Sequence, residues 1–121
     1  MRSGGAVARG RVVGVMMGTG GLSHGGYATR ALPLERARML DVERVFRQRV
    51  DGLLARGVAG LWLHVDADVL DDALMYAVDA REPGGMTFDE LVAVLRIARE
   101  TQRLVGLHVT NYDPDRDPDR R

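Results

Sequence analysis

The chain has 121 residues, of which 45% are hydrophobic and 28% charged, with a formal net charge of zero and no cysteine. This length predicts one domain or a part of one, and the lack of cysteine excludes disulfides, thiolate metal ligands and a cysteine nucleophile. The balanced charge argues against nucleic acid and membrane surfaces as partners. No apolar run is long enough to span a membrane and no secretory signal is evident, so we expect a cytoplasmic protein.

Residues 1–32 are expected to be a Gly-rich N-terminal segment that contains one short strand. Arg11 to Met17 has the β-branched and apolar content that is typical of a buried strand. The five glycines of Gly18 to Gly26 predict a flexible loop, because ordering glycine is entropically expensive. Phosphate binding is an alternative for this loop, but its glycines do not have the Gly-x-Gly-x-x-Gly spacing and no Gly-Lys-Ser/Thr sequence follows.

Residues 33–121 are expected to form most of an α/β layered sheet. Leu34 to Ala55 repeats apolar residues at helical spacing and predicts one amphipathic helix, which Gly57 ends as a C-terminal cap. Gly60 to Val65 is a nearly continuous apolar run, which is typical of a strand in a parallel sheet.

A second helix and a second strand complete the pattern. Thr87 to Glu90 matches a capping box, and the helix that it opens is expected to direct five apolar residues inward: Phe88, Leu91, Val92, Leu95 and Ala98. Arg103 to Thr110 predicts another strand, and the alternating order of helices and strands favours an α/β architecture. The Asp-Pro-rich residues that follow have mixed charge and are expected to be a solvated tail.

Several acidic residues follow the first of these apolar strands. Because strand side chains alternate, we expect Asp66 and Asp68 to project on one side at the carboxyl end of the strand, which is the edge where open α/β sheets bind ligands. A divalent cation such as Mg²⁺ or Mn²⁺ would relieve the repulsion between the two carboxylates, and His64 could add a nitrogen ligand. The alternative is that the aspartates cap a turn or a helix and that His64 is structural.

A wider pattern favours the metal interpretation. Residues 64–85, HVDADVLDDALMYAVDAREPGG, and the MTFDEL that follows resemble the second metal motif of the arginase, agmatinase and formimidoylglutamase family. In that motif Asp66, Asp68 and Asp71 are in register, and Gly84-Gly85 close the loop before a Thr-capped helix. Val105 to Pro114 is similar to the strand and the Asn/Asp-Pro turn that end the family's core. The resemblance spans residues 36–118.

The resemblance implies an arginase-type three-layer α/β/α fold with a parallel sheet, of which this chain is the C-terminal part. It also implies two Mn²⁺ ions per complete site and a hydrolase that acts on C–N bonds in linear amidines, with a small guanidino or amidine compound as substrate. Asp66 and Asp68 would be metal ligands, and Asp71, Gly84 and Gly85 would shape the loop.

The sequence also departs from the family pattern. The family's Gly-Gly-x-His and Asp-x-His-x-Asp elements, which supply further metal ligands, do not occur in this chain. Asn111 stands where many members have a substrate-binding Glu, so it is a substrate-side candidate, while arginine and agmatine become doubtful substrates. His24 lies in a His-Gly sequence similar to one near the family's active site, which makes it a candidate catalytic residue. The alternative is an exposed loop histidine.

Three functions therefore remain open. The first is an arginase-family hydrolase, truncated here, whose metal site is completed elsewhere. The second is a non-catalytic truncated or decayed copy that acts only in assembly, and the third is a small divalent-metal-binding α/β module. A sheet that is cut through its middle exposes an edge and an apolar surface, so we expect the isolated chain to form a homo-oligomer.

Overall fold

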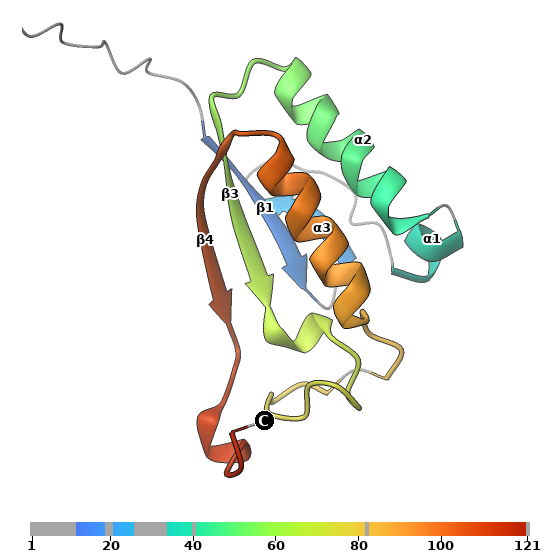
Figure 1. Ribbon diagram of the computed structural model, residues 1–121, viewed down its shortest axis with the longest axis vertical. Coiled ribbons are helices and arrows are strands. Elements are labelled where there is room, and N and C mark those ends of the chain that lie inside the picture. Colours follow the sequence, from blue (N-terminus) through green and yellow to red (C-terminus); the bar gives the residue numbers. More distant parts are fainter. Residues whose placement is uncertain (1–11, 19–20, 26–33, 40, 82, 121) are drawn as a thin grey trace, which may run out of the picture.

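The fold is a four-stranded sheet with helices packed on one face (Figure 1). The computed structural model describes residues 12–18, 21–25, 34–39, 41–81 and 83–120. Its strands are β1 (Val12–Gly18), β2 (Gly21–Gly25), β3 (Gly60–Asp66) and β4 (Leu104–Thr110). Its α-helices are α1 (Leu34–Met39), α2 (Val42–Ala55) and α3 (Phe88–Glu100), and two 3₁₀ helices are η1 (Ala67–Val69) and η2 (Pro114–Arg116).

The sheet is mixed, with β2-β1-β3-β4 as its strand order. Strands β1, β3 and β4 are parallel, and β2 runs antiparallel to β1 at one edge. The three predicted strands are therefore confirmed, and the α/β fold with parallel strands is as expected. Because β1, β3 and β4 run in the same direction, their carboxyl ends meet at one edge of the sheet, from which η1 and the C-terminal segment extend (Figure 1).

One hydrophobic core lies between the sheet and the helices. Leu61, Leu63 and Val65 point from β3 into this core, where they meet buried residues of α2 and α3, such as Phe46 and Val94. The alternate residues of β3 point to the opposite face, and Trp62 is 42% exposed there. Within the described residues, the core thus joins two layers. No described helix is long and apolar enough to cross a membrane.

The loop that was expected from Gly18 to Gly26 is in part a strand, so that prediction is wrong. Residues Gly21–Gly25 form β2, which pairs antiparallel with β1 from Gly18↔Gly21 to Gly14↔Gly25. Glycine is costly to order in an isolated segment, but the adjacent strand supplies backbone hydrogen bonds that offset part of this cost.

The single helix expected from Leu34 to Ala55 is two helices, α1 and α2. The break lies at Asp41, whose φ of 72° is incompatible with a continuous right-handed helix. The Asp41 carboxylate caps α2 by accepting hydrogen bonds from the backbone N–H groups of Glu43 at 3.0 Å and Arg44 at 3.5 Å. Gly57, with φ 77°, follows the last turn of α2 as predicted.

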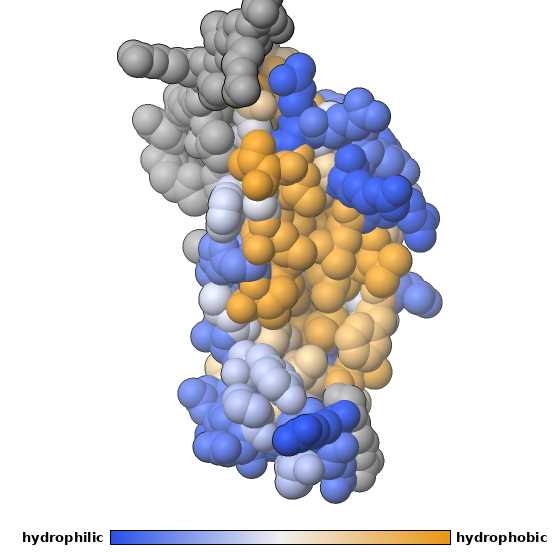
Figure 2. Space-filling model, turned by 60° about the vertical axis from the view of Figure 1, so that its left-hand side comes forward, coloured by the Kyte–Doolittle hydropathy of each residue, from blue (hydrophilic) through white to orange (hydrophobic). Residues whose placement is uncertain are grey.

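Helix α3 begins with the predicted capping box, and it buries the expected apolar face in part. The Thr87 hydroxyl accepts from the Glu90 N–H, and the Glu90 carboxylate accepts from the Thr87 N–H. Ala98 is buried as expected, and Leu91 and Leu95 are partly buried against the core. Phe88 and Val92, which were also expected inward, are each 49% exposed. The buried positions are Ala93, Val94, Ile97 and Ala98. An apolar side of α3 is therefore left uncovered, and with β4 it forms one continuous hydrophobic surface (Figure 2).

The C-terminal residues are not a solvated tail, contrary to the sequence-based expectation. Residues Pro114–Arg116 form η2, and the next residue, Asp117, is only 4% exposed. Its carboxylate accepts hydrogen bonds from the hydroxyls of Tyr76 at 2.6 Å and Tyr112 at 2.7 Å. Charge composition alone predicted solvation, but buried carboxylates are stable where hydroxyls hydrogen-bond them.

Candidate functional site

The two candidate metal ligands lie at the carboxyl edge of the sheet, on different elements. Asp66 is the last residue of β3, and Asp68 is a buried residue within η1. The strand alternation that was used to place both carboxylates on one side therefore ends at Asp66. The position of Asp68 is instead set by the 3₁₀ turn, which begins as soon as the strand stops.

Asp66 closes a row of polar side chains on the face of the sheet opposite the helices. In the register of the parallel pair, His64 lies beside His108 and Asp66 lies beside Thr110. The Trp62 indole N–H hydrogen-bonds to Nδ1 of His108 at 2.5 Å, and the two imidazoles hydrogen-bond to each other through Nε2 of His108 and Nδ1 of His64. The row ends where Nε2 of His64 meets Oδ1 of Asp66 at 2.8 Å.

The direction of every hydrogen bond in this row follows from Trp62. An indole N–H can only donate, so Nδ1 of His108 must accept, and in the neutral ring its proton is on Nε2. That Nε2–H then donates to Nδ1 of His64, whose own proton is on Nε2 and donates to Asp66. The row therefore fixes one tautomer for both histidines and delivers an N–H to the carboxylate.

These contacts keep Asp66 ionised and leave one of its oxygens available. Burial alone would raise the pKa of Asp66, but hydrogen bonds from Thr110 and His64 outweigh it and hold the pKa below its ordinary value. Both bonds fall on Oδ1, because the Thr110 hydroxyl also donates to that atom. Among the described residues, Oδ2 has no hydrogen bond, so it is the oxygen that a cation or a substrate could approach.

Asp71 lies in the loop that follows η1 and hydrogen-bonds to two parts of it. One carboxylate oxygen accepts from the Ala73 N–H at 3.0 Å, and the other accepts from the Gly84 N–H at 2.8 Å, thirteen residues along the chain. Gly84 has φ 78°, which favours glycine. A Cβ on Gly85 would lie 2.6 Å from the Leu70 carbonyl oxygen and 2.5 Å from the Asp71 nitrogen. The two glycines thus allow the loop to return against the end of η1.

Arg38 of α1 holds the same glycine pair from the other side. Its guanidinium donates to the carbonyl oxygens of Gly84 at 2.9 Å and Gly85 at 2.6 Å. It also forms a two-pronged ion pair with Glu90, at 2.8 Å for each contact. This Arg38 bond, partly opposed by burial and helped by the Thr87 N–H, lowers the pKa of Glu90. Arg38 therefore connects α1, the glycine loop and the first turn of α3.

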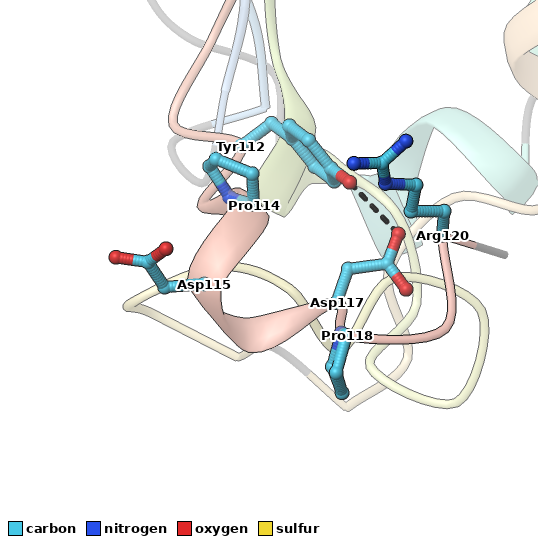
Figure 3. A pocket seen from close by; sticks show the side chains of 6 residues that line it. All are labelled: Tyr112, Pro114, Asp115, Asp117, Pro118 and Arg120. Atoms are coloured by element: carbon cyan, nitrogen blue, oxygen red, sulfur yellow. Dashed lines mark hydrogen bonds between the residues drawn. The ribbon is translucent and has the colours of Figure 1, made fainter.

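The C-terminal segment lies against the loop that carries Asp71. The Asp113 N–H donates to the carbonyl of Ala77 at 2.8 Å, and Arg116 pairs with Asp79 at 2.7 Å. An open hollow of about 590 Å³ lies beside Asp117 and is lined by Tyr112, Pro114, Asp115, Asp117, Pro118 and Arg120 (Figure 3). The hydrogen bond to Asp117, with smaller contributions from burial and charge, raises the pKa of Tyr112.

The remaining sequence-derived candidates lie at different distances from Asp66. Asn111 directly follows Thr110, is exposed and has φ 66°, a conformation that asparagine adopts more readily than most residues. The backbone of His24 pairs with Val15 in β2, two strands away from β3 and level with Leu63. At about 4.8 Å per strand, His24 is roughly 10 Å from β3 across the sheet. The structure thus brings Asn111, but not His24, next to the Asp66 row.

Trp62, His108 and Thr110 belong to the site, although sequence reasoning gave them no role. Both histidines were visible in apolar strands, but only the register His64↔His108 shows that they meet. The sequence did offer one signal for this contact. Each of the two consecutive parallel strands has a histidine at a similar distance from its end.

The donor set tests whether this part of the chain could hold a metal by itself. Asp66 and Asp68 are hard oxygen donors, which suit Mn²⁺ and Mg²⁺. In residues 12–18, 21–25, 34–39, 41–81 and 83–120, however, there is no group of three or more His, Asp or Glu side chains that could surround an ion. The described residues therefore fit as two ligands of a larger site and not as a complete one.

Comparison with known proteins identifies the family. The model of the arginase family matches residues 14–121. Arginase 2, chloroplastic/mitochondrial, from Arabidopsis thaliana is 32% identical over 114 aligned residues, which cover 79% of this chain and 33% of the plant protein. The chain thus spans about a third of the length of the curated relatives it matches.

Solved structures agree on the fold. The arginase from Bacillus subtilis matches with a TM-score of 0.67 at 19% identity and covers 74% of this chain and 31% of its own. Formimidoylglutamase from the same species matches with a TM-score of 0.66 at 19% identity, covering 73% and 27%. The predicted resemblance and the partial arginase-type fold are confirmed, and the chain belongs to the arginase family.

Proposed function

We propose that this chain contributes two carboxylates, Asp66 and Asp68, to the manganese site of an arginase-family hydrolase. The substrate would be a linear amidine of the guanidino type, and hydrolysis would add water across one C–N bond to release an amine. The observation that carries the proposal is the Asp66 carboxylate, ionised at the carboxyl end of an interior parallel strand, with Oδ1 fixed and Oδ2 free of hydrogen bonds among the described residues.

Each candidate residue of this chain would have a separate role in the reaction. A divalent ion, when bound, would lower the pKa of a water molecule and stabilise developing negative charge. Asp66 and Asp68 would hold such ions, and the row from Trp62 to His64 would keep Asp66 in one orientation. Asp71, Gly84 and Gly85 would hold the loop that follows Asp68 and η1. Asn111 would face the substrate with an amide, which lacks the negative charge that a glutamate would offer to a guanidinium cation.

Further metal ligands are needed, because the described residues contain no group of three or more side chains that could hold an ion. They would come from polypeptide outside the described residues or from another chain. A cytoplasmic location remains an expectation from the sequence. The assembly-only alternative is favoured by the same shortage of ligands.

Titration of Mn²⁺ into the protein, followed by calorimetry and by the loss of free-ion electron spin resonance signal, tests the proposal. Because two carboxylates are an incomplete ligand set, we expect weak but saturable binding by the wild type. Asp66→Asn and Asp68→Asn should each weaken it by about tenfold or more, since each removes a charged ligand. Asp89→Asn is the matched control, because it removes an exposed carboxylate on α3. Equal and negligible binding by all four proteins would reject the metal site in this chain and favour the assembly-only function.

A further inference from the structure

One oxygen of the Asp66 carboxylate already accepts two hydrogen bonds from side chains of this chain. Nε2 of His64 lies 2.8 Å from Oδ1, and the Thr110 hydroxyl donates to the same atom. A third contact closes the triangle, because Oγ1 of Thr110 lies 3.2 Å from the same nitrogen of His64. A carboxylate oxygen has about two lone-pair sites for such contacts. Oδ1 of Asp66 is therefore saturated.

A bulge in the pairing of β3 with β4 supplies the second of these hydrogen bonds. The register shifts between Leu61 and Trp62, where β4 contains one extra residue. Without that shift, Val109 would pair with Asp66 in place of Thr110. A valine side chain has no hydrogen-bond donor, so Oδ1 would keep only the bond from the histidine on its own strand. The bulge thus places a hydroxyl beside the carboxylate, as bulges near functional sites often re-aim side chains.

We propose that Thr110 is a positioning residue that limits Asp66 to one metal-binding oxygen, Oδ2, and therefore to one metal ion. A carboxylate that joins two ions usually gives one oxygen to each, which here would require Oδ1. The two-ion site that the family resemblance implies therefore does not fit Asp66 of this chain, whereas a single divalent ion does. This inference rests on the proposed function, since it concerns how Asp66 binds an ion.

The proposal requires that an incoming ion does not displace the two donors from Oδ1. The His64 ring is held at its other nitrogen by His108, which in turn accepts from Trp62. Thr110 is β-branched, which restricts its side-chain rotation, and its hydroxyl contacts both His64 and Asp66. The side chains of His64 and Asp66 are only 23% and 20% exposed. A displaced donor would thus lose its partner where water has little access, which is unfavourable.

Infrared difference spectroscopy of the protein with saturating Mn²⁺ measures how many oxygens Asp66 gives to the ion. The antisymmetric and symmetric carboxylate stretching bands are further apart when one oxygen binds a metal than when both oxygens bind it. Protein labelled with ¹³C-aspartate identifies the aspartate bands, and comparison with Asp66→Asn isolates those of Asp66. We expect the wider separation for the wild type. Thr110→Val should narrow it, because loss of the hydroxyl returns a lone-pair site to Oδ1 in a side chain of similar shape.

Thr110→Ser is the matched control, because it keeps the hydroxyl and should keep the wider separation. A narrow separation in the wild type would overturn the proposal, and this measurement decides even if Thr110→Val does not fold. Equal separations in the wild type and a folded Thr110→Val would overturn the role of Thr110.

Calorimetry on the same samples separates this inference from the proposed function on which it rests. We expect one Mn²⁺ per chain for the wild type. Two ions per chain, both weakened by Asp66→Asn, would overturn the one-oxygen assignment and leave the manganese proposal standing. Absence of Mn²⁺ binding by the wild type would instead reject the proposed function, and the present inference with it.

Discussion

At the scale of single residues, Trp62 determines the tautomers of the two histidines in the candidate site, although it does not contact Asp66 itself. Its indole N–H determines which nitrogen of His108 accepts, and His108 in turn determines the tautomer of His64. The ring also lies against Gly106, where a Cβ would collide with the indole carbons. Because Gly106 has no side chain, the Trp62 ring can lie over β4 and reach His108.

Substituting Trp62 by Phe tests this control of the tautomers. The phenyl ring keeps the packing over Gly106 but removes the donor, so Nδ1 of His108 no longer has to accept. We expect ¹⁵N NMR at about pH 8, where free histidine is neutral, to show the Nε2–H tautomer for both histidines in the wild type and a mixture for His108 in Trp62→Phe. A wild-type His108 protonated on Nδ1 would contradict the assigned direction of the row.

Gly85 tests how closely the loop after η1 packs against the residues that follow Asp68. A methyl group there meets backbone atoms of Leu70 and Asp71, which cannot rotate away. We expect Gly85→Ala to lower the free energy of unfolding by about 1–3 kcal/mol, as in other overpacked sites. Gly52→Ala in α2 is the control: nothing lies within 4 Å of the added methyl, and it should stabilise by about 0.5–1 kcal/mol. Urea denaturation measures both, and a neutral Gly85→Ala would refute the close approach.

Sequence reasoning found the residues whose chemistry is local and missed those that depend on register. Asp66, Asp68 and Asp71 were visible because their spacing is contained in one short segment. The contact between His64 and His108 joins residues 44 apart, and it depends on a shift in the pairing of β3 with β4. No periodicity within either strand contains that information.

At the scale of elements, the start of α3 depends on the charge of Glu90. That carboxylate completes the capping box and also pairs with Arg38, whose guanidinium donates to the glycine loop, so the Glu90–Arg38 pair connects two helices and that loop. By contrast, the break between α1 and α2 was not predicted, because the apolar spacing continues through it. Its cause is the backbone conformation of Asp41, with φ 72°, which hydrophobic periodicity does not report.

The lowered pKa of Glu90 predicts how stability depends on acid. Because the folded pKa lies below the unfolded value of about 4.5, the stabilisation is complete above that value and is lost as the pH falls through the folded pKa. We expect Glu90→Gln, which can retain the capping box, to show a smaller loss of unfolding free energy between pH 6 and pH 3 in urea titrations. Glu100→Gln is the control, since its pair with Arg47 is half exposed. Equal acid dependence of Glu90→Gln and the wild type would count against this role.

At the scale of the whole molecule, the carboxyl edge of the sheet is held together by contacts between segments far apart in the sequence. The loop from η1 to α3 connects to α1 through Arg38 and to the C-terminal segment through Tyr76 and Asp117. The helix face is organised by one hydrophobic core, which apolar spacing largely predicted. The carboxyl edge is organised by hydrogen bonds, and their partners could not be inferred from composition.

Asp117 is the residue whose removal should separate the two segments at that edge. Asp117 is 4% exposed, and its carboxylate accepts from Tyr76 in the loop and from Tyr112, two residues after β4 ends. Asp117→Ala leaves both hydroxyls without this acceptor, and hydrogen bonds to charged groups contribute about 1.5–3 kcal/mol each. We therefore expect faster hydrogen exchange in residues 71–81 and 111–120 together, while α2 and β3 stay protected.

Asp115→Ala is the matched control for that experiment, because Asp115 is exposed in the same 3₁₀ helix. It should leave the exchange of residues 71–81 unchanged. If Asp117→Ala accelerates exchange only in residues 111–120, the C-terminal segment packs on the loop without stabilising it. Joint acceleration, in contrast, would mean that the loop bearing Asp71 is held in place from both sides, by Arg38 and by the C-terminal segment. The geometry next to Asp68 would then depend on residues far from it in the sequence.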